Sequence, residues 1–264
     1  MNDKTDLEKP QKKPLGRLYL VPAPLDFGCD TQSPLASVLP LQTIEVAARL
    51  QHWICENAKS TRAYLKRVGE VQPLAQAVQA LHIQELPREV HKKGDHTGNF
   101  DAKPLLKAAL EGHDMGLVSE AGMPAIADPG SSVVRAAHDV GLQVIALTGP
   151  MSLTLALASS GLNGQNFAFV GYLPQDSGER SQRIKALESL ALKTGQTQIF
   201  IETPYRNAAL LQALHQTLQG NTRLAISCGL TLDTAWTKSA TVVRWKQDKP
   251  QPPLVLPTVF CIGR

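Results

Sequence analysis

The hydrophobic positions in the first half of the chain alternate between two spacings. Runs of consecutive apolar residues predict buried strands, and apolar residues three and four apart predict helices. The predicted strands are 18–21, 53–55, 82–86, 116–119 and 142–147, and the predicted helices are 41–48, 60–68, 73–81, 102–111 and 129–140. Such alternation favours a parallel sheet. Residues 16–148 are therefore predicted to form an N-terminal α/β domain with a parallel sheet.

The second half of the chain has more strands and fewer helices. Strands are predicted at 167–170, 198–201, 224–227, 240–245 and 258–262, and helices at 152–160, 177–192 and 204–218. Thr203 fits the N-cap of the last helix, with Pro204 at its first position. The pattern predicts a mixed-sheet α+β domain over residues 149–264. Residues 1–15 are polar and lysine-rich, and they predict a disordered tail.

Composition narrows the class of protein only a little. The 264 residues carry a formal net charge of +4, and aromatic residues make up 5%. This charge is compatible with a polyanionic partner without requiring one. The four cysteines form no CxxC pair, which favours buried free thiols in a reducing compartment over disulfides or zinc. The first residues lack the apolar region of a signal peptide, and no apolar run approaches the roughly 18 residues that span a bilayer. We expect a cytoplasmic protein.

A loop rich in small residues follows the predicted strand 116–119. Residues 119–130 read SEAGMPAIADPG and lead into a helix, with Asp128 placed to cap that helix and Pro129 at its first position. Small residues let a ligand approach the backbone closely, and such loops lie at the ligand-binding edge of open α/β sheets. A rigid, well-capped turn would have the same sequence, so both interpretations stay open.

A second strand-to-helix turn contains Gly149 and Pro150, and a helix is predicted to begin near Ser152. Free N–H groups and the dipole at a helix start suit a carboxylate ligand. The alternative is a hinge between domains, with Ser152 acting only as a cap. Two such turns after two strands strengthen the ligand interpretation.

Four motifs stand in the order and spacing of one family. They are SEAGMP with ADPG at 119–130, TGPMS at 148–152, FVGYLP with GER at 169–180, and IETPYR at 201–206. The chain resembles the tetrapyrrole methylase superfamily from about residue 16 to 264. Within it, the chain is similar to the branch of ribosomal RNA small subunit methyltransferase I, which methylates a ribose 2′-hydroxyl of 16S rRNA. The resemblance implies two α/β domains with S-adenosylmethionine between them, no metal, and a homodimer.

The resemblance also implies a set of cofactor contacts, which lie on the loops after the predicted strands and at the helix start. By position these are Leu25, Gly122, Met123, Ile126, Ser152, Leu153, Leu173, Leu230 and Thr258. Several are apolar, as expected of residues that bracket an adenine and a sulfonium by shape. For each one taken singly, ordinary core packing is an equal alternative.

Three segments depart from the rRNA branch. The loop 22–28 reads PAPLDFG where the branch has glycine and asparagine, and 56–62 retains its pattern only in Glu56, Thr61 and Arg62. The segment 228–231 reads CGLT and lacks the two charges of the branch. These changes concern the RNA substrate more than the cofactor.

Two carboxylates on the first loop are candidates for catalysis. A ribose hydroxyl is a poor nucleophile, so a general base within hydrogen-bond reach assists its methylation. Glu120 and Asp128 are the candidates. The alternatives are a helix cap for Asp128 and a solvated or ion-paired carboxylate for Glu120.

Basic residues are the candidates for substrate binding. They are Arg62, Lys92, Lys93, Arg180 and Arg183. Lys92 and Lys93 fall in the segment 88–99, predicted as a polar loop, and solvated surface charge is the alternative for each. His91, Asp95 and His96 in that segment lack the spacing of a metal site. The chain has no GxxxxGK[ST], GxSxG or GxGxxG motif.

The resemblance and the two loops predict a methyltransferase that acts on an oxygen of structured, ribosomal RNA. Two alternatives remain open at this stage. One is methylation of a small molecule such as a tetrapyrrole, and the other is a regulatory protein that binds the cofactor without turnover.

Overall fold

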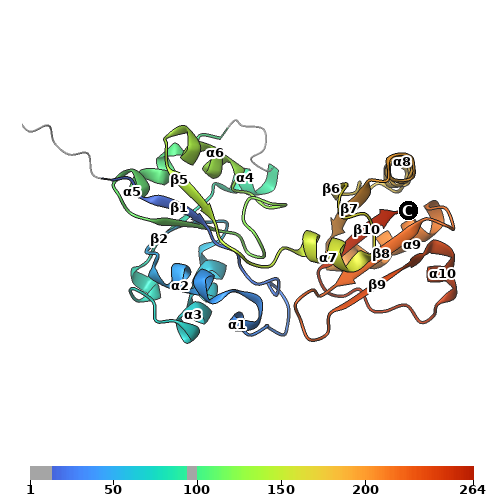
Figure 1. Cartoon of the computed structure of the whole chain (residues 1–264), viewed down its shortest axis with the longest axis horizontal. Coiled ribbons are helices and arrows are strands. Elements are labelled where there is room, and N and C mark those ends of the chain that lie inside the picture. Colours follow the sequence, from blue (N-terminus) through green and yellow to red (C-terminus); the bar gives the residue numbers. More distant parts are fainter. Residues whose placement is uncertain (1–13, 94–99) are drawn as a thin grey trace, which may run out of the picture. The chain divides into compact units, whose positions relative to one another are not determined.

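The structure is a computed structural model that describes residues 14–93 and 100–264 (Figure 1). Its chain divides into two compact units. The first unit comprises residues up to 21, 41–120 and 124–148, and the second comprises 22–40, 121–123 and 149–264. The segments 22–40 and 121–123 thus group with the second unit, although the sequence pattern places them in the first of two contiguous domains.

The first unit contains a sheet of five parallel strands. In chain order these are β1 (Arg17–Leu20), β2 (His52–Cys55), β3 (His82–Glu85), β4 (Met115–Val118) and β5 (Gln143–Ala146). Their order in the sheet is β3-β2-β4-β1-β5, and every pairing is parallel. The predicted parallel α/β arrangement of this half is therefore confirmed.

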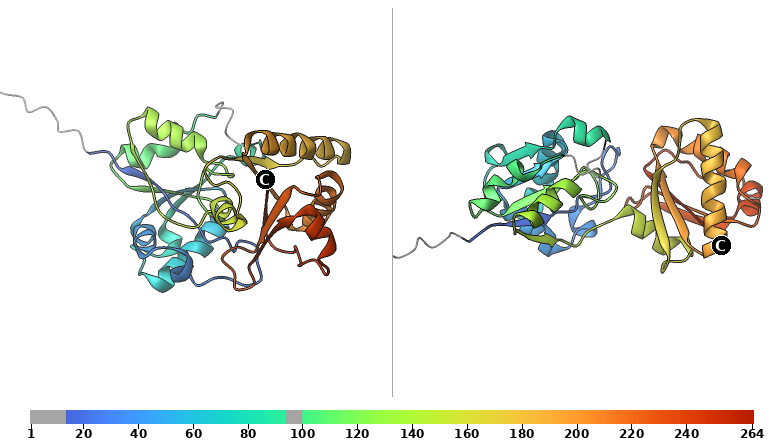
Figure 2. Two further views of the ribbon diagram at one scale, coloured as in Figure 1. Left: turned by 45° about the vertical axis from the view of Figure 1, so that its right-hand side comes forward. Right: turned by 90° about the horizontal axis from the view of Figure 1, so that it is seen from above.

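Helices cover both sides of this sheet. They are α2 (Leu41–Arg49), α3 (Ala58–Val71), α4 (Arg88–Lys93), α5 (Lys107–Leu110), α6 (Ser131–Asp139) and the 3-10 turns η1 (Val78–Ala80) and η2 (Lys103–Leu106). Leu106 of η2 and Val133 of α6 pack with Leu18 and Leu117 of the strands in one buried cluster. Figures 1 and 2 show α2 and α3 on the opposite side from α6.

The second unit contains a mixed sheet of five strands. These are β6 (Phe167–Tyr172), β7 (Thr197–Glu202), β8 (Arg223–Cys228), β9 (Trp236–Thr241) and β10 (Thr258–Gly263). Their order is β6-β7-β10-β8-β9. The pair β6–β7 is parallel and the remaining pairs are antiparallel. The predicted mixed sheet is confirmed.

The helices of the second unit also lie on both faces of their sheet (Figure 2). They are α7 (Ser152–Ser160), α8 (Ser177–Thr194), α9 (Asn207–Thr217), α10 (Val242–Gln247) and the 3-10 turn η3 (Pro204–Arg206). The segment 22–40 contains the further short helix α1 (Leu35–Val38), which is not one of the helices on this sheet. Ile184 of α8, Leu214 of α9 and Trp245 of α10 share one core cluster with Phe260. Leu157 of α7 belongs to another, with Ala225 and Val259.

Some predicted elements were wrong, because tertiary contacts and caps override local patterns. The predicted helix 73–81 is replaced by irregular chain and the short turn η1, and the Ala75 N–H donates instead to the Ala48 carbonyl at 2.8 Å. The predicted strand 240–245 ends at Thr241, whose side chain accepts the N–H of Arg244 and caps α10. The predicted loop 88–99 begins with helix α4, and residues 94–99 lie outside the described residues.

The cysteine prediction agrees with the structure. All four cysteines are free, and Cys55, Cys228 and Cys261 are buried. Burial raises the pKa of the Cys55 thiol to about 11 and that of Cys261 to about 12, so both are protonated at neutral pH. Across residues 14–93 and 100–264, no helix has the length and apolar character needed to span a membrane.

Candidate active site

The carboxyl ends of β2 and β4 bring acidic residues to one edge of the first sheet. These strands are parallel neighbours, with Cys55 opposite Val118. Glu56 follows β2 directly, and Ser119 and Glu120 follow β4. Because parallel strands end at the same edge, residues distant in sequence meet there. Sequence reasoning noted Glu56 only as a retained motif position and did not include it in the site.

Asp128 belongs to the same acidic group and does not cap a helix. Helix α6 begins at Ser131, its N-cap is Gly130 and no side chain caps it, so the predicted capping role of Asp128 is wrong. Gly130 takes this position with φ of 134°, a conformation that side chains disfavour. Burial raises the pKa of Asp128 to about 7, and the charges of Glu56 and Glu120 add to the effect. Asp128 thus titrates near neutral pH.

The carboxylate of Glu120 is positioned by a neighbouring helix. Ser60 of α3 donates its hydroxyl to Glu120 Oε1 at 3.0 Å. The first turn of α3 is fixed in turn by Asn57, whose side chain accepts the N–H groups of Lys59 and Ser60. Ser119 is 5% exposed, and its hydroxyl has no hydrogen-bond partner among the described residues. The edge therefore combines three carboxylates with an unused donor, a suitable environment for proton transfer.

The loop that carries Asp128 has an unusual backbone. Ala125 and Ala127 have φ values of 65° and 64°, in the left-handed region that costs an L-residue about 1–2 kcal/mol. Ile126, between them, is 41% exposed. Strained backbone of this kind persists where surrounding packing imposes it, and it concentrates at functional sites.

A second cluster of predicted residues forms around Gly122 in the second unit. Gly122 pairs with Ala23 through two backbone hydrogen bonds of 2.9 and 3.0 Å. Its φ is 70°, and a Cβ atom there would lie 3.2 Å from Leu25 Cδ2 and 3.5 Å from the Pro150 carbonyl oxygen. The structure thus brings together Leu25, Gly122 and the turn before α7, and their role as cofactor contacts stays a prediction.

The start of α7 is open to a ligand. Its N-cap is Met151 and no side chain caps it, so the alternative role of Ser152 as the cap is wrong. The first N–H groups of a helix without a side-chain cap remain available to an anion. The backbone near Gly122 thus allows close approach, and this helix start offers N–H donors to an anionic group.

The remaining predicted cofactor residues lie at several places. Leu153 and Leu230 pack in the cluster beneath α7, whereas Leu173 is 3% exposed and packs in the core on the other face. Thr258 accepts from Asn207 Nδ2 at 3.0 Å and donates to the Leu256 carbonyl. Met123 is partly buried. The side chains of Leu153, Leu173 and Thr258 are buried in the core. Any contact of these residues with the cofactor would involve their backbone, and it stays a prediction.

The predicted substrate-binding residues do not form one cluster within either unit. Arg62 is exposed on α3 of the first unit, and Lys92 and Lys93 end α4, with side chains outside the described set. Arg180 and Arg183 lie in the first two turns of α8 in the second unit. Lys92 and Lys93 share α4, and Arg180 and Arg183 share α8, so substrate binding by these residues stays a prediction.

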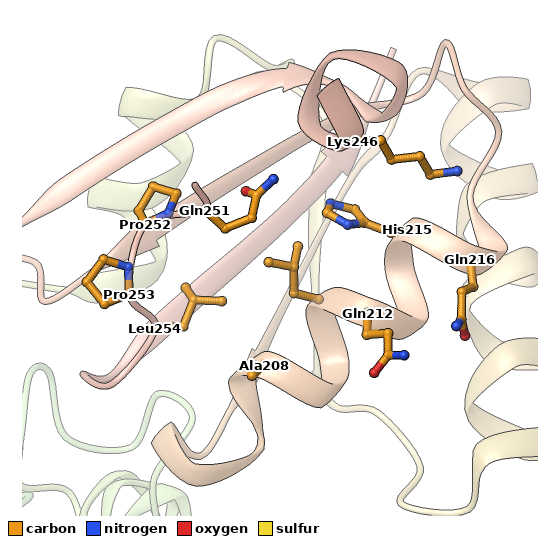
Figure 3. Close-up of a pocket in the computed structure, with 10 residues that line it drawn as sticks. Ala208, Gln212, His215, Gln216, Lys246, Gln251, Pro252, Pro253 and Leu254 are labelled. Atoms are coloured by element: carbon orange, nitrogen blue, oxygen red, sulfur yellow. The ribbon is translucent and has the colours of Figure 1, made fainter. Parts of the chain in front are cut away.

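One hollow of the second unit lies away from the predicted residues. A cavity of about 530 Å³ is bounded by α9, the end of α10 and residues 251–254 (Figure 3). His215, Lys246 and Gln251 are among the side chains around it, and no residue predicted from the sequence lines it. Three or more metal-binding side chains do not come together anywhere in the described part of the chain. Asp95 and His96 lie outside that part.

A parallel-sheet unit followed by a mixed-sheet unit is a fold known from solved structures. The methyltransferase CobJ, known from a crystal structure, superposes with a TM-score of 0.53 over 94% of this chain and 94% of that chain. At 15% sequence identity this likeness concerns the fold alone.

The chain belongs to the tetrapyrrole (corrin/porphyrin) methylase family, whose model matches residues 41–242. Ribosomal RNA small subunit methyltransferase I of Mesorhizobium japonicum is 33% identical over 81% of this chain and 63% of the relative. The protein of that name from Escherichia coli O157:H7 is 31% identical over 72% of this chain and 57% of the relative. The chain thus matches somewhat less than two thirds of the length of these relatives.

Proposed function

We propose that the protein is an S-adenosylmethionine-dependent methyltransferase that modifies a ribose 2′-hydroxyl of small-subunit ribosomal RNA. Membership of the tetrapyrrole methylase family and the names of the relatives support the reaction and the substrate class. The single observation that carries the chemistry is Asp128, whose pKa of about 7 suits a general base at neutral pH.

In the proposed mechanism a carboxylate at the acidic edge of the first sheet accepts the proton of the substrate hydroxyl. When bound, S-adenosylmethionine supplies a methyl group that its sulfonium already activates. Asp128 would accept the proton that the ribose hydroxyl gives up when this methyl group is transferred to its oxygen. Burial keeps the pKa of Asp128 high, and the charges of Glu56 and of Glu120, which Ser60 holds, add to this effect, so the carboxylate is basic enough to take the proton.

The cofactor would be held mainly by residues of the second unit. Gly122 and Leu25 offer a close-fitting backbone surface, and the start of α7 at Ser152 offers donors to a carboxylate. We also propose that the enzyme is a cytoplasmic homodimer, on the family resemblance. Light scattering should give twice the chain mass of 28.6 kDa, and a particle of 28.6 kDa would contradict the dimer.

The test is methyl transfer to small ribosomal subunits from a strain that lacks the gene. With tritiated-methyl cofactor, we expect label in 16S rRNA, recovered after alkaline hydrolysis in a dinucleotide that the 2′-O-methyl group protects. Label in mononucleotides would show a base as acceptor, and label in a small-molecule extract would show a different substrate. Calorimetric cofactor binding without label anywhere would identify a non-catalytic protein.

A further inference from the structure

Two tyrosines stand exposed at the carboxyl end of the parallel strand pair β6–β7. Tyr172 ends β6 opposite Ile201 of β7, and Tyr205 lies in η3, just beyond β7. Tyr205 is 80% exposed, more than any other large hydrophobic side chain that the structure describes, and Tyr172 is 56% exposed. An aromatic ring with this exposure contributes little to the packing of the core, so its presence on the surface suggests a role in binding.

A fixed guanidinium lies beside these rings. Arg206 Cζ is 5.3 Å from the centre of the Tyr205 ring, and both tyrosines interact electrostatically with Arg206. Glu202 Oε1 accepts from Arg206 Nε at 2.9 Å and from Arg206 Nη2 at 2.7 Å. The carboxylate of Glu202 is 4% exposed and also accepts the Thr203 N–H at 2.7 Å. The guanidinium plane is therefore held in place before any ligand arrives.

Rings and a guanidinium at one place form a surface that suits a nucleobase. Every base has a π-face, so stacking on tyrosine or arginine is tolerant of sequence. Because Glu202 already orders Arg206, stacking costs little additional side-chain entropy. A base inside a duplex has both faces covered by its neighbours and cannot stack on a protein side chain. The partner of this surface is therefore an unpaired base.

Cations near the same strand end suit the backbone of that nucleotide. Only residues 173–176 separate Tyr172 from α8, whose first two turns carry Arg180 and Arg183. Arg183 is exposed. Arg180 is partly buried, and its Nε atom has no hydrogen-bond partner in the part of the chain that the structure describes. These charges complement phosphate and favour RNA over an uncharged or basic partner.

We propose that Tyr205, supported by Arg206 and Tyr172, stacks on an unpaired base of the RNA that the enzyme methylates. This inference rests on the proposed function and names the part of the substrate that this surface binds. Tyr205 is a binding residue in it and takes no part in the transfer of the methyl group.

The test compares variants of Tyr205 in binding to deproteinised 16S rRNA and to assembled small subunits. Tyr205→Ala should weaken binding to both by roughly 5- to 150-fold, while Tyr205→Phe, which keeps the ring, should stay within about threefold of wild type. Melting temperature and calorimetric cofactor affinity should not change in either variant. Phe167→Ala, at the other end of β6 and 46% exposed, is the matched control and should bind RNA normally.

The outcomes separate this inference from the proposed function. Methylation of RNA by wild type with unchanged binding by Tyr205→Ala would overturn the stacking surface alone. A loss in Tyr205→Phe equal to that in Tyr205→Ala would assign the effect to the hydroxyl and overturn stacking. A loss confined to assembled subunits would indicate a ribosomal protein as the partner. Binding without methyl transfer would refute the function and leave the surface, and no RNA binding by wild type would refute both.

Discussion

Two sheet edges of this molecule use carboxylates in opposite ways. At the end of β7, Glu202 is almost fully buried, and its Oε1 lies 2.7 Å from Arg206 Nη2 in an ion pair. At the ends of β2 and β4, burial raises the pKa of Asp128 to about 7, and the charges of its neighbours Glu56 and Glu120 add to the effect. The same type of side chain thus fixes a cation for binding in one unit and takes up a proton in the other. A buried carboxylate with a cation beside it holds that cation, whereas a buried carboxylate with only acidic neighbours takes up a proton more readily.

The largest expected effect comes from removing the titrating carboxylate. Asp128→Asn should lower kcat at least about 100-fold, because an amide cannot accept the hydroxyl proton. Wild-type kcat should rise with pH through about 7, as Asp128 deprotonates, and the variant should lose this dependence. Asp139→Asn, an exposed carboxylate at the end of α6, is the matched control. A variant with normal kcat would remove Asp128 from the mechanism.

The next effect concerns cofactor affinity. Gly122→Val should weaken S-adenosylmethionine binding by more than about tenfold, because a branched side chain at φ 70° would meet Leu25 and the Pro150 carbonyl. Gly141→Val is a control for backbone strain alone, since Gly141 has φ of 77° and nothing within 4 Å of its Cβ position. Calorimetry should separate the two variants, and equal affinities would show that the Gly122 turn is only structural.

The same carboxylate should also affect stability in a pH-dependent way. The folded protein binds the Asp128 proton more tightly than the unfolded chain, so wild-type stability falls as pH rises from about 4 to about 7. Asp128→Asn should therefore be more stable than wild type by roughly 1–2 kcal/mol at pH 8, and by less at pH 5. Urea unfolding at both pH values measures this difference. A gain that is larger at pH 5 would contradict the raised pKa.

The smallest expected effect tests the strained loop. Ala127→Gly should raise the free energy of unfolding by up to about 1 kcal/mol, because glycine adopts φ of 64° without strain and loses only part of that gain to unfolded-state entropy. Ala63→Gly, on the exposed face of α3, should lower it by about 1 kcal/mol. Thermal unfolding of the two variants compares them directly, and a loss in both would argue against strain at Ala127.

The sequence by itself determined the elements with strong periodicity and the loops with unusual composition. The alternation of strands and helices predicted the parallel sheet, and the larger number of strands than helices predicted the mixed sheet. Both patterns are visible because the spacing of hydrophobic residues reflects which faces are buried. The small residues of 119–130 and of 148–152 marked the two turns around which Gly122, Asp128 and Ser152 lie.

Only the tertiary structure decided what those side chains do. Asp128 fits a helix cap by local pattern, but Glu56 and Glu120 arrive beside it through the pairing of β2 with β4, which no local pattern encodes. Helix 73–81 failed for the same reason, since a distant carbonyl of α2 binds its backbone. The exposure of Tyr205 could not be predicted from the sequence either, because it depends on the position of the end of β7 within its sheet. Pairing between distant segments sets burial and charge environment, and these set the chemistry.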